Sequence, residues 1–261
     1  WILDDVEPLR EAVTAAASSV HLLAPLVATR LRAKGTSAKP WPPSTPLAQT
    51  PPPGAVIDYW LASDAATAVT LTVRDAGGRT IRTFSSDDPP EALPASPYFQ
   101  DGWLGTAPHG EATAGMHRFV WDLRYPRPDA LSYDYSIAAV WHEGTPLDPR
   151  GPLALPGRYT VSLTANGTTA TRTLTVRMDP RVHVAASSLR AQFALAMSVD
   201  STLDRATATH RRVRAYLAAH QGGLSPAETD SATAIAGDLA TVDGVLASLA
   251  ALYLLTRTPL G

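Results

Sequence analysis

The spacing of apolar residues changes once along this chain, and the change divides it into two structural classes. Before Asp179 apolar residues recur at every second position, as in half-buried strands; after Arg181 they recur at every third or fourth position, as in helices. We therefore predict a mainly β part followed by an α part: an antiparallel β-sandwich over residues 52–181 and an antiparallel helical hairpin over 182–261.

Alternating segments and glycine turns predict the strands. The segments are 56–61, 68–74, 79–84, 117–123, 158–164 and 169–176. Asp75-Ala76-Gly77-Gly78 joins the first predicted hairpin, and Asn166-Gly167 joins the second, because Asn-Gly supplies the positive φ angles of a two-residue turn. This turn also accounts for the glycosylation pattern Asn-Gly-Thr at the same place. Trp121 is predicted to lie in the core.

One apolar seam is predicted on each helix. The seam residues are Leu189, Phe193, Met197, Leu203, His210, Val213 and Leu217 on the first helix, and Ile235, Leu239, Val242, Leu246, Leu249 and Tyr253 on the second. Ser225 with Glu228 is a capping box, and Pro226 suits the first helical position. We expect the seams to pack within the hairpin and against the sandwich; a dimer interface or a docking arm is the alternative.

Prolines mark the irregular parts of the chain. Seven of them lie between Gly35 and Gly54, which predicts an extended strap. Residues 1–31 combine a short helical pattern at Val6, Leu9 and Val13 with an extended apolar run over 20–27, and are too few for a core of their own. The stretches 85–115 and 125–156 are predicted to be loops between strands.

The composition excludes several classes of protein. The net charge of -2 and the pI near 6.4 lack the basic excess of a nucleic-acid-binding protein. The absence of cysteine excludes disulfides, thiol nucleophiles and thiolate metal sites. We expect no membrane span, since Asp238, Asp243 and Gly244 interrupt the apolar stretch 235–255. The chain begins at Trp1 with no signal-peptide pattern, so we expect a part of a longer or processed protein.

No catalytic motif stands out, so we predict no catalytic residue and no cofactor. The sequence lacks a His-Glu-x-x-His helix, a Gly-x-Ser-x-Gly elbow and a phosphate-binding glycine loop. For glycoside hydrolysis, which needs two carboxyl groups across a cleft, the best candidates are Glu111 and Glu143 with Asp101. Candidate metal ligands are His109, His117 and His142 with Asp101 or Glu143, and, for calcium, Asp122, Asp129 and Asp134. None of these sets has a ligand spacing, so no metal is predicted.

Aromatic residues are the better candidates for a binding role. The predicted loops contain Trp103, Tyr133, Tyr135 and Trp141, beside Tyr98 and Phe99. A flat row of such rings can stack on sugar faces, so the first four are the candidate carbohydrate-binding residues. The alternative is that these rings pack the loops onto the sandwich or onto another domain.

Several segments carry a resemblance to known bacterial families. VTLTVRDAGGRTIRTF at 69–84, GMHRFVWDLRY at 115–125 and PGRYTV at 156–161 are similar to the immunoglobulin-like domain of flagellar hook-capping proteins. Four segments resemble the C-terminal region of BNR-repeat or sortilin-like glycosyl hydrolases, in which a β-propeller precedes this region: WILDDVEPLRE at 1–11, PPGAVIDYWL at 52–61, FVWDLRY at 119–125 and MDPR at 178–181. The proline-rich strap and the long loops depart from that pattern, and no Asp-box occurs here.

The resemblance implies an immunoglobulin-like sandwich and an accessory role. We predict three parts: a propeller-derived segment with the strap over 1–51, the sandwich over 52–181 and the hairpin over 182–261. The chain is expected to be a non-catalytic structural module of an exported protein, docked through its N-terminal segment on the β-propeller of the same protein. The alternatives are a carbohydrate-binding module, with polysaccharide as the partner, and a part of a glycoside hydrolase whose active site lies mainly in the propeller.

Overall fold

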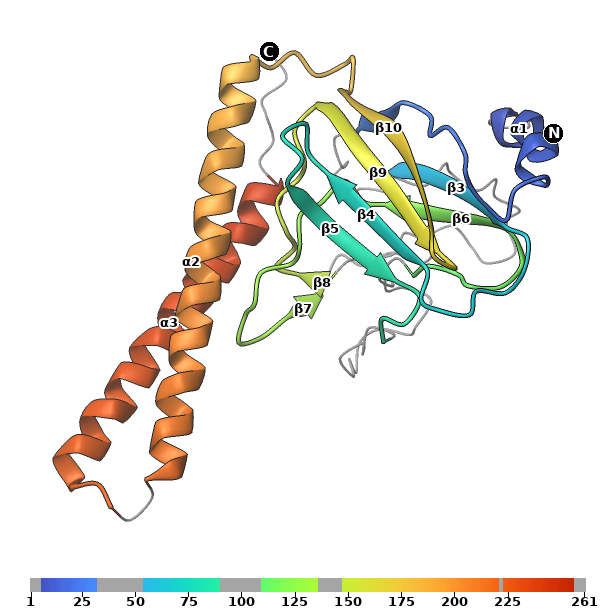
Figure 1. The fold of residues 1–261 in the computed structure, drawn as a ribbon. Helices are drawn as coiled ribbons and strands as arrows, with labels where there is room; N and C mark the ends of the chain where they lie inside the picture. The colour runs from blue at the N-terminus through green and yellow to red at the C-terminus, as the bar shows by residue number, and fades with distance from the viewer. Residues whose placement is uncertain (1–5, 32–53, 90–108, 136–146, 221–222, 256–261) are drawn as a thin grey trace, which may run out of the picture.

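The structure is a computed structural model that describes residues 6–31, 54–89, 109–135, 147–220 and 223–255 of the chain. It is a mixed fold in which several antiparallel β-sheets precede two long packed helices, as the change of apolar spacing predicts (Figure 1). The proline-rich strap and large parts of both predicted loops, including Trp103 and Trp141, lie outside the described residues.

The first sheet has three strands in the order β1-β3-β6: β1 (Val20–Leu22), β3 (Ala55–Leu61) and β6 (Gly115–Trp121). Both neighbouring pairs are antiparallel, and the register sets Ile57 opposite Phe119. Alternation sends Phe119 and Trp121 to the buried face of β6, as predicted; Trp121 is 0% exposed. On the partly exposed face, Arg118 forms two hydrogen bonds of 2.8 and 2.9 Å with Asp58.

The second sheet has five strands in the order β2-β10-β9-β4-β5. They are β2 (Ala28–Arg30), β10 (Thr168–Met178), β9 (Gly157–Ala165), β4 (Thr70–Arg74) and β5 (Thr80–Ser85). All pairs are antiparallel except β10 with β2. Asn166 and Gly167 have φ angles of 49° and 73°, which confirms the two-residue turn.

One apolar core lies between these two sheets. It contains Ile57, Tyr59 and Trp121 from the first sheet and Val161 and Leu174 from the second. Aromatic pairs cross it: the rings of Phe84 and Phe119 lie 4.7 Å apart, and those of Trp121 and Tyr159 meet edge-on at 5.6 Å. We call the two sheets together the β body.

Part of the N-terminal segment belongs to the two sheets. The strand β1 joins the first sheet and β2 the second, and Val20, Leu22 and Ala28 are buried in the common core. Both strands supply backbone groups to sheet edges and apolar side chains to one core, so the segment 20–30 belongs to the β body. The helix α1 (Glu7–Ala15) lies at the end remote from the helical hairpin (Figure 1), where its Glu11 accepts the backbone N–H of Ala24 at 3.2 Å.

The C-terminal part is the predicted helical hairpin, made of α2 (Ala186–Ala219) and α3 (Pro226–Leu255). The capping box at the start of α3 is confirmed: the backbone N–H of Ser225 donates to Glu228 at 2.9 Å and the backbone N–H of Glu228 donates to Ser225 Oγ at 3.4 Å. The hairpin projects from the β body, with the α2–α3 turn at its far tip (Figure 1).

The predicted seam holds for α2 and is partly wrong for α3. On α2 Leu203 is fully buried and the other predicted seam residues are half-buried. On α3 Leu239 and Leu246 are half-buried, whereas Ile235, Val242 and Leu249 are 52%, 46% and 37% exposed. The buried positions of α3 are instead Ala236 and Asp243, since the polar contacts of Asp243 turn that side of the helix inward. The side chain of Tyr253 lies outside the described residues.

Helix α3 also bears on the expectation of no membrane span. Within the described residues, one segment, Pro226–Leu249, is long and apolar enough by length and composition to cross a membrane, with a mean hydropathy of 1.3. Only 11% of it is buried. Its Asp243 is held in polar contacts with the rest of the chain, which are described next.

Candidate functional site

The loop that leaves β6 is held in place by a buried arginine. The indole N–H of Trp121 donates to the carbonyl of Arg124 at 3.0 Å, and the guanidinium of Arg124 donates to the carbonyl of Gly151 at 2.9 Å. Burial, with the nearby charge of Arg150, lowers the pKa of Arg124 to about 9. A Cβ atom on Gly151 would lie 2.1 Å from the carbonyl oxygen of Tyr125, so this close approach requires glycine.

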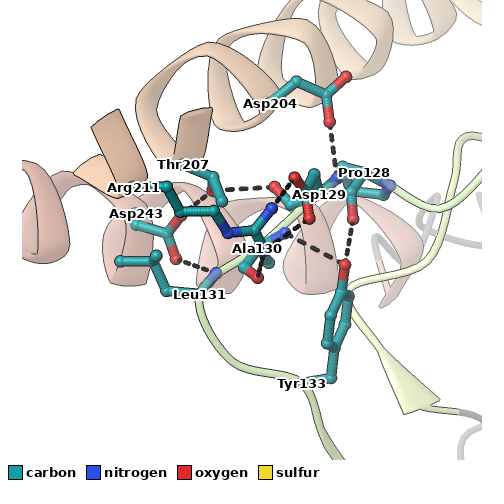
Figure 2. A network of polar contacts seen from close by, with 9 residues as sticks. All are labelled: Pro128, Asp129, Ala130, Leu131, Tyr133, Asp204, Thr207, Arg211 and Asp243. Atoms are coloured by element: carbon teal, nitrogen blue, oxygen red, sulfur yellow. Dashed lines mark hydrogen bonds and ion pairs between the residues drawn. The ribbon is translucent and has the colours of Figure 1, made fainter. Parts of the chain in front are cut away.

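The loop then reaches the helical hairpin, where polar residues from three segments meet (Figure 2). We call this place the junction. Its members are Asp129, Ala130, Leu131 and Tyr133 from the loop, Asp204, Thr207 and Arg211 from α2, and Asp243 from α3. In the described part of the chain, the junction joins the loop that leaves β6 to both helices of the hairpin through side chains far apart in sequence, which makes it the candidate site.

Asp243 is the centre of the junction. Its carboxylate accepts a hydrogen bond from the hydroxyl of Thr207 and another, at 3.2 Å, from the backbone N–H of Leu131. Asp243 is 2% exposed and Thr207 is 0% exposed, while the Thr207 hydroxyl also lies 2.9 Å from the carbonyl oxygen of Asp129. These bonds join two helices and the loop through one buried carboxylate, and buried polar groups are costly unless they are paired in this way.

Asp129 adds an ion pair on the more exposed side. Both of its carboxylate oxygens accept from the guanidinium of Arg211, whose pKa is raised by the hydrogen bond and the charge of Asp129. The backbone N–H of Asp129 donates to Asp204 at 2.6 Å. Within the loop, Tyr133 donates to the carbonyl of Pro128 at 2.8 Å and accepts from the N–H of Ala130 at 3.1 Å. The loop is therefore tied both to α2 and to itself.

One carboxyl group near the junction titrates close to neutrality. Asp200 is half-buried on α2, four residues before Asp204. Burial and the neighbouring charge of Asp204 raise the pKa of Asp200 to about 7, because both effects disfavour its ionised form. A single titrating carboxyl is not a catalytic pair.

The junction is suited to holding segments together. Its carboxylates accept hydrogen bonds from a hydroxyl, from backbone N–H groups and from a guanidinium. In the described part of the chain, no group of three or more histidine or acidic residues is arranged to hold a metal ion. What the geometry provides is a fixed attachment of the hairpin to the β body.

The structure describes two of the four predicted sugar-binding residues. Tyr135, in the short strand β7 (Asp134–Tyr135), is 7% exposed and packs against Leu147 of β8 (Leu147–Asp148). Tyr133 packs against this pair, and the guanidinium of Arg127 lies 5.4 Å from its ring centre. Both rings are thus engaged by the protein itself. Trp103 and Trp141 lie outside the described residues, so sugar binding remains a prediction.

The candidate metal and catalytic residues do not converge where they are described. Of the proposed calcium ligands, Asp122 accepts from the N–H of Arg124, Asp129 is paired with Arg211, and Asp134 accepts from the N–H of Tyr135. His117 contacts the carbonyl of Thr113 at 2.6 Å, and His109 and Glu111 lie near the start of β6. Their proposed companions Asp101, His142 and Glu143 fall outside the described residues.

Sequence reasoning missed the junction itself. It treated Asp243 as an interruption of an apolar stretch and did not assign it a partner. The available signal was the helical position of Asp243, which lies four residues after Leu239 and three before Leu246 and so falls on the packed side of α3. An acidic residue there requires a hydrogen-bond partner. Its partners come from 36 and 112 residues away in sequence, so their identity could not be read from local spacing.

Comparison with known proteins adds no assignment, because no protein-family model, no curated protein and no solved structure matches the chain.

Proposed function

We propose that this chain is a non-catalytic structural module of an exported bacterial protein, in which it docks on a β-propeller of the BNR-repeat or sortilin-like glycosyl-hydrolase kind. In this proposal the β body is an immunoglobulin-like sandwich. The common core between its two sheets and the Asn-Gly hairpin support that assignment. We infer the partner, a β-propeller, from the sequence segments that resemble the propeller proteins.

The observation that carries the proposal is the exposed apolar side of α1. Val6, which directly precedes the helix, and Leu9 and Val13 within it follow a helical spacing and are 39%, 62% and 83% exposed. Leu26 and Val27, on the connection between β1 and β2, are 45% and 52% exposed as well. Apolar groups gathered in this way are typical of a surface that another domain covers. We call Val6, Leu9 and Val13 the α1 face.

The pairing of β1 and β2 within the two sheets limits the part of the N-terminal segment that is free to dock. Because these two strands belong to the β body, the proposed docking contact consists of the α1 face and the connection between β1 and β2. The β body then acts as a rigid support that presents the α1 face at one end and the hairpin at the other (Figure 1). A structural role also agrees with the junction, whose side chains bind one another.

The first test is the size of the native protein in the exported fraction of the source organism. An immunoblot with antibodies against this chain is expected to show a band far above 27.6 kDa. A band near 27.6 kDa would overturn the proposal, since it leaves no room for a propeller.

The second test addresses the α1 face directly. The chain is mixed with the polypeptide encoded upstream of it in the same reading frame, and association is measured by light scattering after gel filtration. Leu9→Glu with Val13→Glu is expected to weaken association at least tenfold, and the control Thr14→Glu, on an exposed neighbouring position, is expected to leave it within twofold. Equal association of the two variants, or glycosidase turnover by the chain alone, would contradict the proposal.

A further inference from the structure

The hairpin has a second apolar face whose side chains are exposed in the described part of the chain; of these, only the ring of Tyr216 stacks on another ring there, that of His220. On α3 it consists of Ile235, Val242, Val245 and Leu249, which are 52%, 46%, 56% and 37% exposed. On α2, Leu195 and Tyr216 are 46% and 50% exposed. We call these six residues the outer face.

The outer face follows a seven-residue repeat on both helices. Residues 195, 202, 209 and 216 of α2 are seven apart, as are 235, 242 and 249 of α3. Seven residues make nearly two helical turns, so each set forms one stripe along its helix. Thr202 and Thr209 occupy the two middle positions on α2, and a mixed stripe of this kind suits helix packing.

Both stripes lie on the side of the hairpin that points away from the β body. Thr202 and Thr209 precede Asp204 and Arg211 by two residues, and two residues correspond to about 200° around a helix. Since Asp204 and Arg211 contact the loop of the β body, the α2 stripe lies opposite that contact. On α3, Val245 follows Asp243 by two residues, so it lies about 200° around the helix from the carboxylate that contacts the loop. The two stripes therefore form one continuous surface.

We propose that this outer face is the interface of a homodimer, in which the hairpins of two copies form a four-helix bundle. The proposal goes beyond the docking function and does not depend on it. A hairpin of two helices can bury only the sides that face each other, and a second hairpin laid against its outer face completes a bundle core. Along α2 the outer face runs from residue 195 to residue 216, about 32 Å at about 1.5 Å per residue, and two helices side by side are about 20 Å wide. The face therefore offers roughly 600 Å² per partner, which lies at the lower end of what specific interfaces bury.

Charge favours a second copy as the occupant. The helix α2 carries five arginines and two aspartates, whereas α3 carries four acidic residues and no basic one. On the outer face, Asp238 is exposed between Ile235 and Val242, and the exposed Arg205 and Arg212 flank the stripe of α2. Laying α3 of one copy beside α2 of the other brings these opposite charges together.

The same observations disfavour a membrane as the occupant. A helix lying on a membrane surface uses lysine and arginine to contact the head groups, and α3 has neither. A helix spanning the bilayer would carry Asp238 and Asp243 into the hydrocarbon and would break the bonds of Asp243 to Thr207 and Leu131. In this proposal α3 is apolar over its length because two of its sides are packed, one against α2 and one against a second copy.

The test measures the mass of this chain by sedimentation equilibrium at about 1 to 100 μM, concentrations that reach the weak, micromolar end of protein–protein affinities. We expect a species of twice 27.6 kDa for the natural chain. Val242→Glu is expected to weaken dimerisation at least a hundredfold, whereas Thr233→Glu, which adds the same charge on the other side of α3, is expected to change it less than threefold. Circular dichroism checks that the helices of both variants form.

A charge exchange tests the arrangement of the two copies. Asp238→Arg alone, and Arg205→Glu with Arg212→Glu, are each expected to weaken the dimer about tenfold, and the three changes together are expected to restore it. A natural chain that stays monomeric at 100 μM, or a dimer indifferent to Val242→Glu, overturns the proposal. So does a monomer that co-sediments with phosphatidylcholine–phosphatidylglycerol vesicles through α3, which would identify the outer face as a membrane contact.

Discussion

Thr207 of α2 donates a hydrogen bond to Asp243 of α3, and both side chains are almost completely withdrawn from water, at 0% and 2% exposed. The same carboxylate accepts the backbone N–H of Leu131 from the loop of the β body. One acidic side chain thus fixes the helices to each other and to the sheets, and it sets the rotation of α3 that leaves Val242 and Ile235 exposed.

Replacing Asp243 is expected to destabilise the protein. Asp243→Ala leaves the Thr207 hydroxyl and the Leu131 N–H without their acceptor, and an unpaired buried group costs about 1 to 3 kcal/mol. Asp230→Ala removes an exposed carboxylate from the same helix, away from the outer face, and is expected to change the free energy of unfolding by less than about 0.5 kcal/mol. Urea denaturation of the two variants checks this difference. Equal stabilities would show that the junction contributes nothing.

Asp200 is expected to make stability depend on pH in the neutral range. Its pKa is raised from 3.8 to about 7 in the folded chain, so between these values the folded state binds the extra proton. Stability should therefore fall as the pH rises from about 4 to about 7 and should then level off. Asp200→Asn removes this dependence on pH. The free energy of unfolding of the variant, relative to that of the natural chain, should therefore increase as the pH rises from about 4 to about 7.

The exposed Asp230→Asn is the control for that experiment. Thermal denaturation from pH 4 to pH 8 gives the comparison. An identical pH profile for Asp200→Asn and the natural chain would contradict the raised pKa.

Two glycines are expected to respond to alanine in opposite directions. Gly167 has a φ of 73°, so Gly167→Ala should destabilise the β9–β10 turn by roughly 1 kcal/mol. Gly237 lies inside α3 with open space around it, so Gly237→Ala should stabilise the protein by about 0.5 to 1 kcal/mol. Chemical denaturation measures both. Effects of the same sign would be inconsistent with these backbone conformations.

The capping box at the start of α3 gives a further prediction. Ser225→Ala removes the oxygen that faces the N–H of Glu228, and loss of such a cap costs about 1 kcal/mol. Ser231→Ala, within the same helix, is the matched control and is expected to be nearly neutral or slightly stabilising. If the two variants unfold at the same denaturant concentration, the cap does not stabilise α3.

Local patterns account for what the sequence predicted well. Alternation located β3, β4, β5, β6, β9 and β10, the Asn166-Gly167 turn joined the last two, and Ser225 marked the start of α3. In each case the deciding interactions lie within a few residues, so the sequence contains them.

Contacts between distant segments account for the features that the sequence predicted less well. The parallel pairing of β2 with β10 joins Ala28 to Val176, and no local pattern specifies such a partner. The rotation of α3 also depends on a contact made elsewhere in the chain, because Asp243 selects the inward side against the larger side chains of Ile235 and Val242. The junction depends on contacts between segments far apart in sequence, so it could be identified only from the folded structure.

The central claim is that the chain is a rigid support whose hairpin has one fixed orientation on the β body. The most direct measurement is the distance between spin labels on Thr173→Cys in β10 and Ser231→Cys near the tip of the hairpin, since the chain has no cysteine of its own. Dilution with unlabelled chain restricts the signal to one copy. We predict a single narrow distance distribution that broadens when Asp243→Ala and Arg211→Ala are added; a broad distribution in the chain without these two changes would contradict the claim.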